Sequence, residues 1–243
     1  MQRSLSAGTD AAGLCIFDPA AMPGDFDGRL REDPPAALDE LAAAGRLYRW
    51  ETGADGSYTL GLWVDKAMPS DLRPHAQPLA QLPAFQIPGG RLYFAGIEYV
   101  FRDDDAFLKK HPHMGQSSDV PAGTYGFELY ELAYPEGYHE DLLNHRLTHA
   151  ERRAHAAINV LLPVGGVLLA VATVLMFVLS LRSWATMVLP FAAIVLLVML
   201  ASTRLPAYRR ARQVKRSMAL EQPDYALVLR RQDESSRGAR AQP

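Results

Sequence analysis

The chain has 243 residues, of which 49% are hydrophobic and 21% are charged, and its formal net charge is −2. The charge is unevenly divided, because residues 1–150 hold 12 Lys and Arg against 22 Asp and Glu, whereas residues 151–243 hold 13 against 5. The acidic first part argues against nucleic acid as a partner, since phosphates attract basic surfaces. The single cysteine, Cys15, excludes an intrachain disulfide. We expect it to be a small buried apolar residue.

The N-terminal half of the chain predicts a β-rich domain. Asp33 is followed by two prolines and then by an apolar run that ends near Gly45, which predicts a short helix. Residues 46–65 carry two strand-like runs around a GADG turn and predict a β-hairpin. Further strands are expected within 88–102 and 121–132. The expected domain therefore combines several strands with one or two helices.

Two pairs of strand-like segments in this domain are similar to each other. Residues 12–22 and 55–65 are echoed by residues 89–100 and 122–132, and each pair has a strand led by glycine followed later by a Gly-x-Tyr strand. An internal duplication explains the echo, and so does chance, because short β-strands share such patterns. The sequence leaves both explanations open.

The middle of the chain predicts a membrane anchor. Residues 138–155 have leucines and alanines at helical spacing and predict a stalk helix. Residues 156–181 and 184–203 contain no charged side chain. Because about 20 apolar residues are enough for a helix to cross a bilayer, these runs predict two transmembrane helices joined by an external turn at 182–183.

The basic residues that flank these runs predict their orientation. Positive charges gather on the cytoplasmic side of membrane proteins, and here they precede the first run and follow the second. We therefore expect a multi-pass protein of the bacterial inner membrane with both termini in the cytoplasm and the lipid bilayer as a partner. The residues predicted to lie at the membrane interface are Arg182, Trp184, Arg204, Arg209, Arg210, Arg212, Lys215 and Arg216.

The first apolar run also contains closely spaced small residues, namely Gly165, Gly166 and Ala170. Small residues four apart allow two helices to approach closely. The expected contact is with the second transmembrane helix, and homodimerisation through the same face is the alternative.

The C-terminal part divides into two segments. Residues 204–231 predict a basic juxtamembrane helix followed by a strand near 224–231, and the sequence leaves open whether this strand docks on the β-rich domain. Residues 232–243 are polar and are expected to form a disordered tail. The β-rich domain itself is expected to cover residues 1–137.

The sequence contains no recognisable catalytic motif, phosphate-binding loop or cofactor-binding motif, so no cofactor and no catalytic residue are predicted. The weak metal-ligating candidates are His145 and His149, four residues apart on the expected stalk, together with Asp103, Asp105, His111 and His113. Neither group has the spacing of a known zinc or calcium site. We therefore expect ordinary solvated side chains rather than a metal site.

These observations predict an α+β membrane protein whose N-terminal β-rich cytoplasmic domain is followed by a two-helix transmembrane hairpin. The predicted function is that of a non-catalytic binding module, of an immunity or regulatory type, with a protein partner. The alternative function is that of a membrane-tethered metal-dependent enzyme that uses Asp103, Asp105, His111 and His113.

Overall fold

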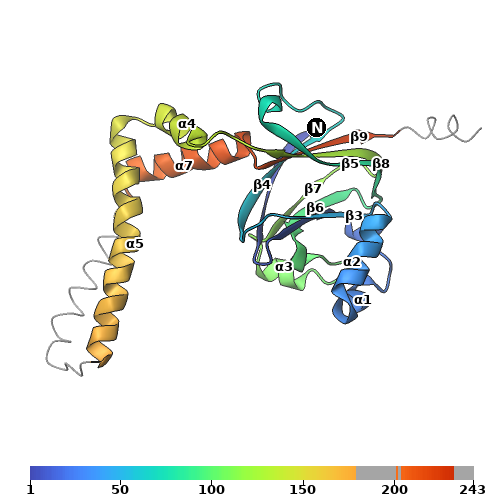
Figure 1. Ribbon diagram of the computed structural model, residues 1–243, viewed down its shortest axis with the longest axis horizontal. Coiled ribbons are helices and arrows are strands. Elements are labelled where there is room, and N and C mark those ends of the chain that lie inside the picture. The colour runs from blue at the N-terminus through green and yellow to red at the C-terminus, as the bar shows by residue number, and fades with distance from the viewer. Residues whose placement is uncertain (179–200, 202–203, 233–243) are drawn as a thin grey trace, which may run out of the picture. The chain divides into compact units, whose positions relative to one another are not determined.

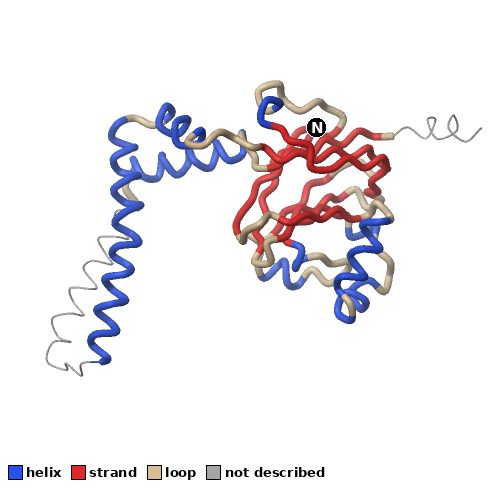
Figure 2. The backbone as a smooth tube through the Cα atoms, viewed as in Figure 1, coloured by secondary structure: helices blue, strands red, loops and turns tan. Residues whose placement is uncertain are grey.

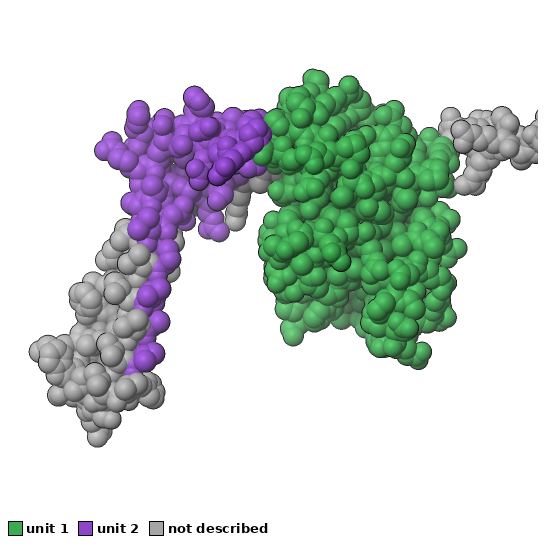
Figure 3. Space-filling view, in the orientation of Figure 1, with its two compact units in different colours: residues 1–134, 219–243 green, residues 135–218 purple. Residues whose placement is uncertain are grey.

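The computed structural model describes residues 1–178, residue 201 and residues 204–232 (Figure 1). The predicted turn at 182–183 and all but one residue of the predicted helix at 184–203 lie outside the described residues, as does nearly all of the predicted tail. The chain forms two compact units, which Figure 3 distinguishes by colour. The first comprises residues 1–134 and 219–243, and the second comprises residues 135–218.

The first unit is a sandwich of two β-sheets (Figure 2). The five-stranded sheet has, in spatial order, β1 (Gln2–Thr9), β4 (Gly56–Val64), β9 (Tyr225–Arg231), β8 (Gly123–Leu132) and β5 (Ala76–Ile87). The four-stranded sheet has β3 (Leu47–Glu51), β2 (Gly13–Phe17), β6 (Arg91–Gly96) and β7 (Gly115–Asp119).

The main hydrophobic core lies between the two sheets. Alternate residues of β4, namely Leu60, Leu62 and Val64, point into it, as the two-residue period of a strand requires. Phe94 contributes from the four-stranded sheet, and Tyr125 from β8 is fully buried. Burial of large apolar side chains such as these, at about 25 cal/mol for each Å² removed from water, is the main force that holds the sheets together.

Strand β9 lies in the middle of the five-stranded sheet, although it comes from the C-terminal part of the chain. It pairs in parallel with β4 and antiparallel with β8. Leu227 and Leu229 on this strand are fully buried in the main core. The β-sandwich is therefore completed by a segment that follows the helices of the second unit in sequence, which answers the question of docking that the sequence leaves open.

The two halves of the sandwich, residues 1–64 and 76–132, have the same strand topology. In the first half, β1 pairs with β4 and β2 pairs with β3, while in the second half β5 pairs with β8 and β6 pairs with β7. Strands β2 and β6 pair with each other. Strand β9 lies between β4 and β8, which are equivalent strands of the two halves.

The registers of the two halves also agree. Thr9 pairs with Gly56, and the equivalent Ile87 pairs with Gly123. The Gly-x-Tyr strands that the sequence singles out are β4 and β8, and their tyrosines make the same local contact. The hydroxyl of Tyr58 donates to the carbonyl of Ala54, and the hydroxyl of Tyr125 donates to the carbonyl of Pro121.

The predicted hairpin at 46–65 does not form. Strands β3 and β4 are joined by the expected turn, but they belong to different sheets, because β3 pairs with β2 and β4 pairs with β1 and β9. A turn signal shows that the chain reverses but not which strand becomes its hydrogen-bonded partner. The connection between β3 and β4 takes the chain from the four-stranded sheet to the five-stranded sheet on the other side of the core.

Short helices cover the outer face of the four-stranded sheet, on one side of the sandwich in Figure 1. They are η1 (Pro19–Ala21), α1 (Phe26–Glu32), α2 (Pro34–Ala43), η3 (Ile97–Tyr99) and α3 (Ala106–Lys110). Helix α2 corresponds to the helix expected after Asp33, whose side chain accepts a hydrogen bond from the N–H of Ala36. Cys15 is fully buried beneath these helices, so its prediction is confirmed. The turn η2 (Arg73–His75) leads into β5.

The second unit contains helices α4 (Tyr138–Arg146), α5 (His149–Val178) and α7 (Pro206–Glu221), the last of which extends beyond the unit boundary. The continuous stalk predicted over 138–155 is interrupted, because Thr148 and Glu151 form a capping box that starts a new helix. Helices α5 and α7 are in contact, since the rings of His155 and Tyr208 are stacked with their centroids 6.1 Å apart.

The predicted membrane architecture is wrong. Within residues 1–178, 201 and 204–232, the structure has no helix that combines the length and the apolar character needed to cross a bilayer. This overturns the transmembrane helix predicted over 156–181, and with it the inner-membrane location, the multi-pass topology and the lipid bilayer as a partner. An uncharged run is a necessary condition for a transmembrane helix, but it does not establish one by itself. Helix α5 begins at His149 with a charged first turn and contains Pro163.

Candidate binding surface

An exposed aromatic cluster lies on the side of the sandwich that α3 covers. The ring of Phe107 is stacked on that of Tyr99 with centroids 4.9 Å apart, and His111 lies edge-on to Phe107 at 5.2 Å. His113 follows at 6.2 Å from His111. Phe107 is 54% exposed, whereas Tyr99 beneath it is 5% exposed. We call these four residues the Phe107 patch.

The local sequence explains why Phe107 faces outward. Helix α3 has only five residues, and Leu108 uses its buried side to join the cluster under the four-stranded sheet. The neighbouring Phe107 points in a different direction, because consecutive residues of a helix are about 100° apart.

The loop before α3 is held in place by Asp27 of α1. Its carboxylate accepts hydrogen bonds from the N–H groups of Arg102, Asp103 and Asp104 at 2.7, 3.0 and 3.1 Å. Burial of Asp27 opposes its ionisation, but the three backbone N–H groups outweigh burial and hold the pKa of this carboxyl below its ordinary value. The loop that positions the Phe107 patch is thus fixed by a side chain distant in the sequence.

A second feature adjoins the patch and consists of four carboxylates, which we call the acidic corner. They are Asp10, Glu51, Asp55 and Glu98. Asp55 and Glu98 accept hydrogen bonds from backbone N–H groups of the β1–β2 loop, and Glu51 pairs with Gly13 at the end of the same loop. None of the four makes an ion pair with the part of the chain that the structure describes. Their charges are therefore uncompensated locally.

Tyr99 links the patch to the acidic corner. Burial and then the negative charges of Asp10 and Glu98 raise the pKa of Tyr99 above its ordinary value. Close packing also fixes the position of Glu98, because a Cβ at Gly96 would lie 2.6 Å from the carbonyl oxygen of Gly8 and 2.9 Å from the Glu98 carboxylate. The aromatic and acidic features thus adjoin each other at the buried Tyr99.

The predicted metal candidates are engaged in other contacts. Asp103 pairs with Arg102 at 3.3 Å and Asp105 with Lys109 at 2.8 Å, while His111 and His113 belong to the Phe107 patch. In residues 1–178, 201 and 204–232, no three His, Cys, Asp or Glu side chains gather in a metal-binding arrangement. The finding that contradicts the membrane assignment also contradicts the alternative function of a membrane-tethered metal-dependent enzyme.

His145 and His149 were predicted to share one helix face. They lie in different helices, α4 and α5, because the chain leaves helical conformation at Leu147. Their four-residue spacing therefore does not place the two rings on a common face, which is the condition for ligating one metal ion.

The residues predicted to lie at a membrane interface are distributed over α7 and its surroundings. Arg210 contacts Glu151 of α5 at 3.5 Å. Burial is the main cause that lowers the pKa of His155, and the positive charge of Lys215 lowers it further. Arg204, Arg209 and Arg212 are exposed, and Arg216 lies in α7. Arg182 and Trp184 lie outside the described residues.

The small residues predicted for helix packing all lie in α5. Gly166 and Ala170 are exposed, and a Cβ at Gly166 would meet no atom within 4 Å among the described residues. Gly165 is their neighbour on the same helix. Homodimerisation through this face stays a prediction.

No protein-family model matches the chain, and no curated protein sequence matches it. Two solved structures are similar. One is titled Crocagin biosynthetic gene J, with 17% identity and a TM-score of 0.38 over 58% of this chain and 79% of that one. The other is ComJ from Bacillus subtilis, titled an inhibitor of the DNA degrading activity of NucA, with 12% identity and a TM-score of 0.31 over 54% of this chain and 81% of that one. At these values the likeness supports no functional conclusion.

Proposed function

We propose that the β-sandwich is a non-catalytic module that binds a basic protein partner through the Phe107 patch and the acidic corner. The observation that carries the proposal is Phe107, a large aromatic side chain that is 54% exposed and stacked on a buried tyrosine. Aromatic side chains held rigidly at a surface are typical binding hot spots, because they bury much area and lose little conformational entropy.

The charge of the partner follows from the acidic corner. Four carboxylates without an ion-pair partner among the described residues favour a positively charged surface opposite them. Electrostatic complementarity of this kind mainly raises the association rate and the specificity. Phe107 then supplies the apolar centre of the contact and the carboxylates its polar rim.

The proposal is tested by capturing a partner with the full chain and measuring its affinity for two alanine variants. Phe107→Ala is expected to weaken binding at least about tenfold, the loss typical of a hot-spot aromatic. Leu79→Ala is the matched control, since Leu79 is 37% exposed on β5, outside the Phe107 patch and the acidic corner. Both variants should unfold within about 0.5 kcal/mol of the unmodified chain.

The acidic corner is tested on the same partner by changing the salt concentration. The association rate should fall as salt rises, and neutralisation of Glu51 and Asp55 together should flatten that dependence. Equal affinities of the Phe107→Ala and Leu79→Ala variants, or an association rate that does not respond to salt, would count against the proposed surface.

A further inference from the structure

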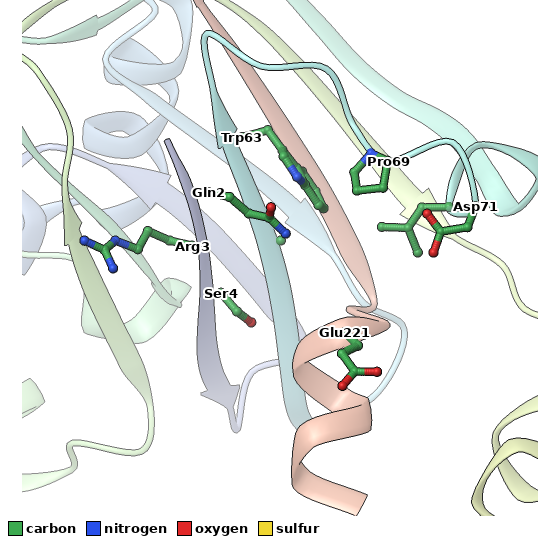
Figure 4. A pocket seen from close by; sticks show the side chains of 9 residues that line it. Gln2, Arg3, Ser4, Trp63, Pro69, Asp71 and Glu221 are labelled. Atoms are coloured by element: carbon green, nitrogen blue, oxygen red, sulfur yellow. The ribbon is translucent and has the colours of Figure 1, made fainter. Parts of the chain in front are cut away.

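A pocket of about 320 Å³ lies on the outer face of the five-stranded sheet. Its lining includes Gln2 and Ser4 of β1, Trp63 of β4, and Pro69 and Asp71 of the connection between β4 and β5. In Figure 4, Gln2 and Asp71 lie on opposite sides of Trp63, with Pro69 between Trp63 and Asp71. The volume is at the lower end of the range for small-molecule sites, which suits a single side chain.

The register of the sheet builds this pocket. Gln2 pairs with Trp63 and Ser4 with Gly61, so these four residues share one face of the β1–β4 ladder. Gly61 makes room for the indole, because a Cβ at this position would lie 2.3 Å from the ring of Trp63. Leu72 from the β4–β5 connection packs in the same cluster as Trp63 and also lines the pocket.

Two buried polar atoms at the pocket have no hydrogen-bond partner in the described part of the chain. They are the indole Nε1 of Trp63 and the hydroxyl Oγ of Ser4. Trp63 is only 3% exposed, and leaving a buried donor unsatisfied costs about 1–3 kcal/mol. A ligand that brings a hydrogen-bond acceptor to these two donors would recover that cost.

The charged groups at the pocket indicate the remainder of the ligand. Asp71 and Glu221 contribute carboxylates to the lining, while the side chain of Arg3 extends away from the other labelled residues in Figure 4. A positively charged group is therefore favoured near Asp71, and the apolar surfaces of Trp63 and Pro69 suit an aliphatic stem beside it.

We infer that this pocket binds a lysine or arginine residue of an extended peptide. The cationic head lies at Asp71, the stem packs against Trp63 and Pro69, and a peptide carbonyl accepts hydrogen bonds from Trp63 and Ser4. The site is separate from the Phe107 patch and shares no residue with it. This inference can therefore be tested independently of the proposed function.

The test is a titration of the ¹⁵N-labelled full chain followed by the NMR signals of its indole N–H groups. The chain has three tryptophans, and the variant Trp63→Phe identifies the signal of Trp63 by its loss. The probe is N-acetyl-lysine amide, and N-acetyl-norleucine amide, which has the same stem without the charge, is the control ligand. The lysine probe should shift the Trp63 signal to saturation, while the norleucine probe should cause no saturable shift.

Two variants locate the binding. Asp71→Asn is expected to weaken the lysine probe about two- to fivefold, as for an ion pair near solvent, whereas Asp39→Asn on α2 should leave its affinity unchanged. Phe107→Ala should also leave it unchanged, which separates this site from the proposed protein-binding surface. Equal shifts with both probes, no saturable shift of Trp63, or equal affinities of the Asp71→Asn and Asp39→Asn variants would each overturn the inference.

Discussion

The two halves of the sandwich share a strand topology but differ in what they insert between the strands of the four-stranded sheet. The first half inserts η1, α1 and α2 between β2 and β3, whereas the second half inserts η3 and the five-residue α3 between β6 and β7. The longer insertion packs as a stable cover, and the shorter one leaves Phe107 exposed. The comparison shows that the two halves share one arrangement of strands and that their insertions differ in how much apolar surface they leave exposed.

The halves also hold each other's loops through carboxylates. Asp18 in the first half accepts a hydrogen bond from the N–H of Gly89 in the second at 2.6 Å, and Asp27 holds the loop at 102–104. In the opposite direction, Glu98 accepts from the N–H of Asp10 at 2.7 Å. Several carboxylates of the acidic residues 1–150 therefore have structural roles in holding loops.

The largest expected effect comes from removing the strand between the halves. A chain that ends at Pro223 lacks β9, so β4 and β8 each lose a ladder partner and the core loses Leu227 and Leu229. We expect the loss of cooperative unfolding, because one buried leucine alone contributes about 2–5 kcal/mol and whole domains are stable by only about 5–15.

This prediction is checked by circular dichroism during thermal unfolding. The matched control is Arg230→Ala, which leaves β9 in place and removes only a contact with Glu128 at 3.4 Å between partly exposed side chains. Its effect should stay below about 1 kcal/mol. If the truncated chain unfolded cooperatively near the midpoint of the full chain, the two halves would be shown to pair without β9.

The sequence predicts local elements well and their partners poorly. The capped helix after Asp33, the buried Cys15 and the similarity between the β2–β4 and β6–β8 segments could be read from composition and spacing. The transfer of β4 to the opposite sheet could not, because strand pairing is decided by core packing over long sequence separations. The insertion of β9 is of the same kind, since the whole second unit separates it from β8 in the sequence, and β4 lies further away still.

The candidate site was only partly visible in the sequence. His111 and His113 were only weak metal-ligating candidates, and the structure places His111 beside the rings of Phe107 and Tyr99 and His113 beside His111. The spacing of histidines does not show what packs against them. Glu98 had no local signal at all, since its role depends on contact with the β1–β2 loop far away in the sequence.

The next effect compares equivalent tyrosines in the two halves. Tyr125 is fully buried, whereas Tyr58 is only partly buried, and both donate to the carbonyl four residues earlier. Tyr125→Ala should cost about 3–5 kcal/mol, as for a large aromatic in a core. Tyr58→Ala should cost about 1–2 kcal/mol, because much of its surface is already in water.

The phenylalanine variants at the same positions separate the hydroxyl from the ring. Tyr125→Phe and Tyr58→Phe each remove one hydrogen bond, so each should cost about 1 kcal/mol. Chemical denaturation gives all four values. Equal costs for the two alanine variants would show that the halves are equivalent in energy as well as in topology, contrary to the burial difference described above.

The last of these effects tests the contact between the halves at Asp27. Asp27→Asn keeps the size of the side chain but removes the charge that accepts three backbone N–H groups, and we expect a loss of about 1–2 kcal/mol near neutral pH. Asp25→Asn is the control, since the Asp25 side chain makes no capping hydrogen bond at the start of the same helix. Its effect should stay within about 0.5 kcal/mol.

The pH dependence of the Asp27→Asn effect has a definite sign. Because the folded-state pKa of Asp27 lies below the value of about 3.9 for an unfolded chain, its ionisation stabilises the fold fully above that pH and loses this effect as pH falls through the folded-state pKa. The stability difference between the unmodified chain and the variant should therefore be constant above about pH 5 and shrink in more acidic solution. Denaturation at several pH values measures it, and a difference that grew on acidification would mean that the Asp27 carboxylate does not anchor the loop at 102–104.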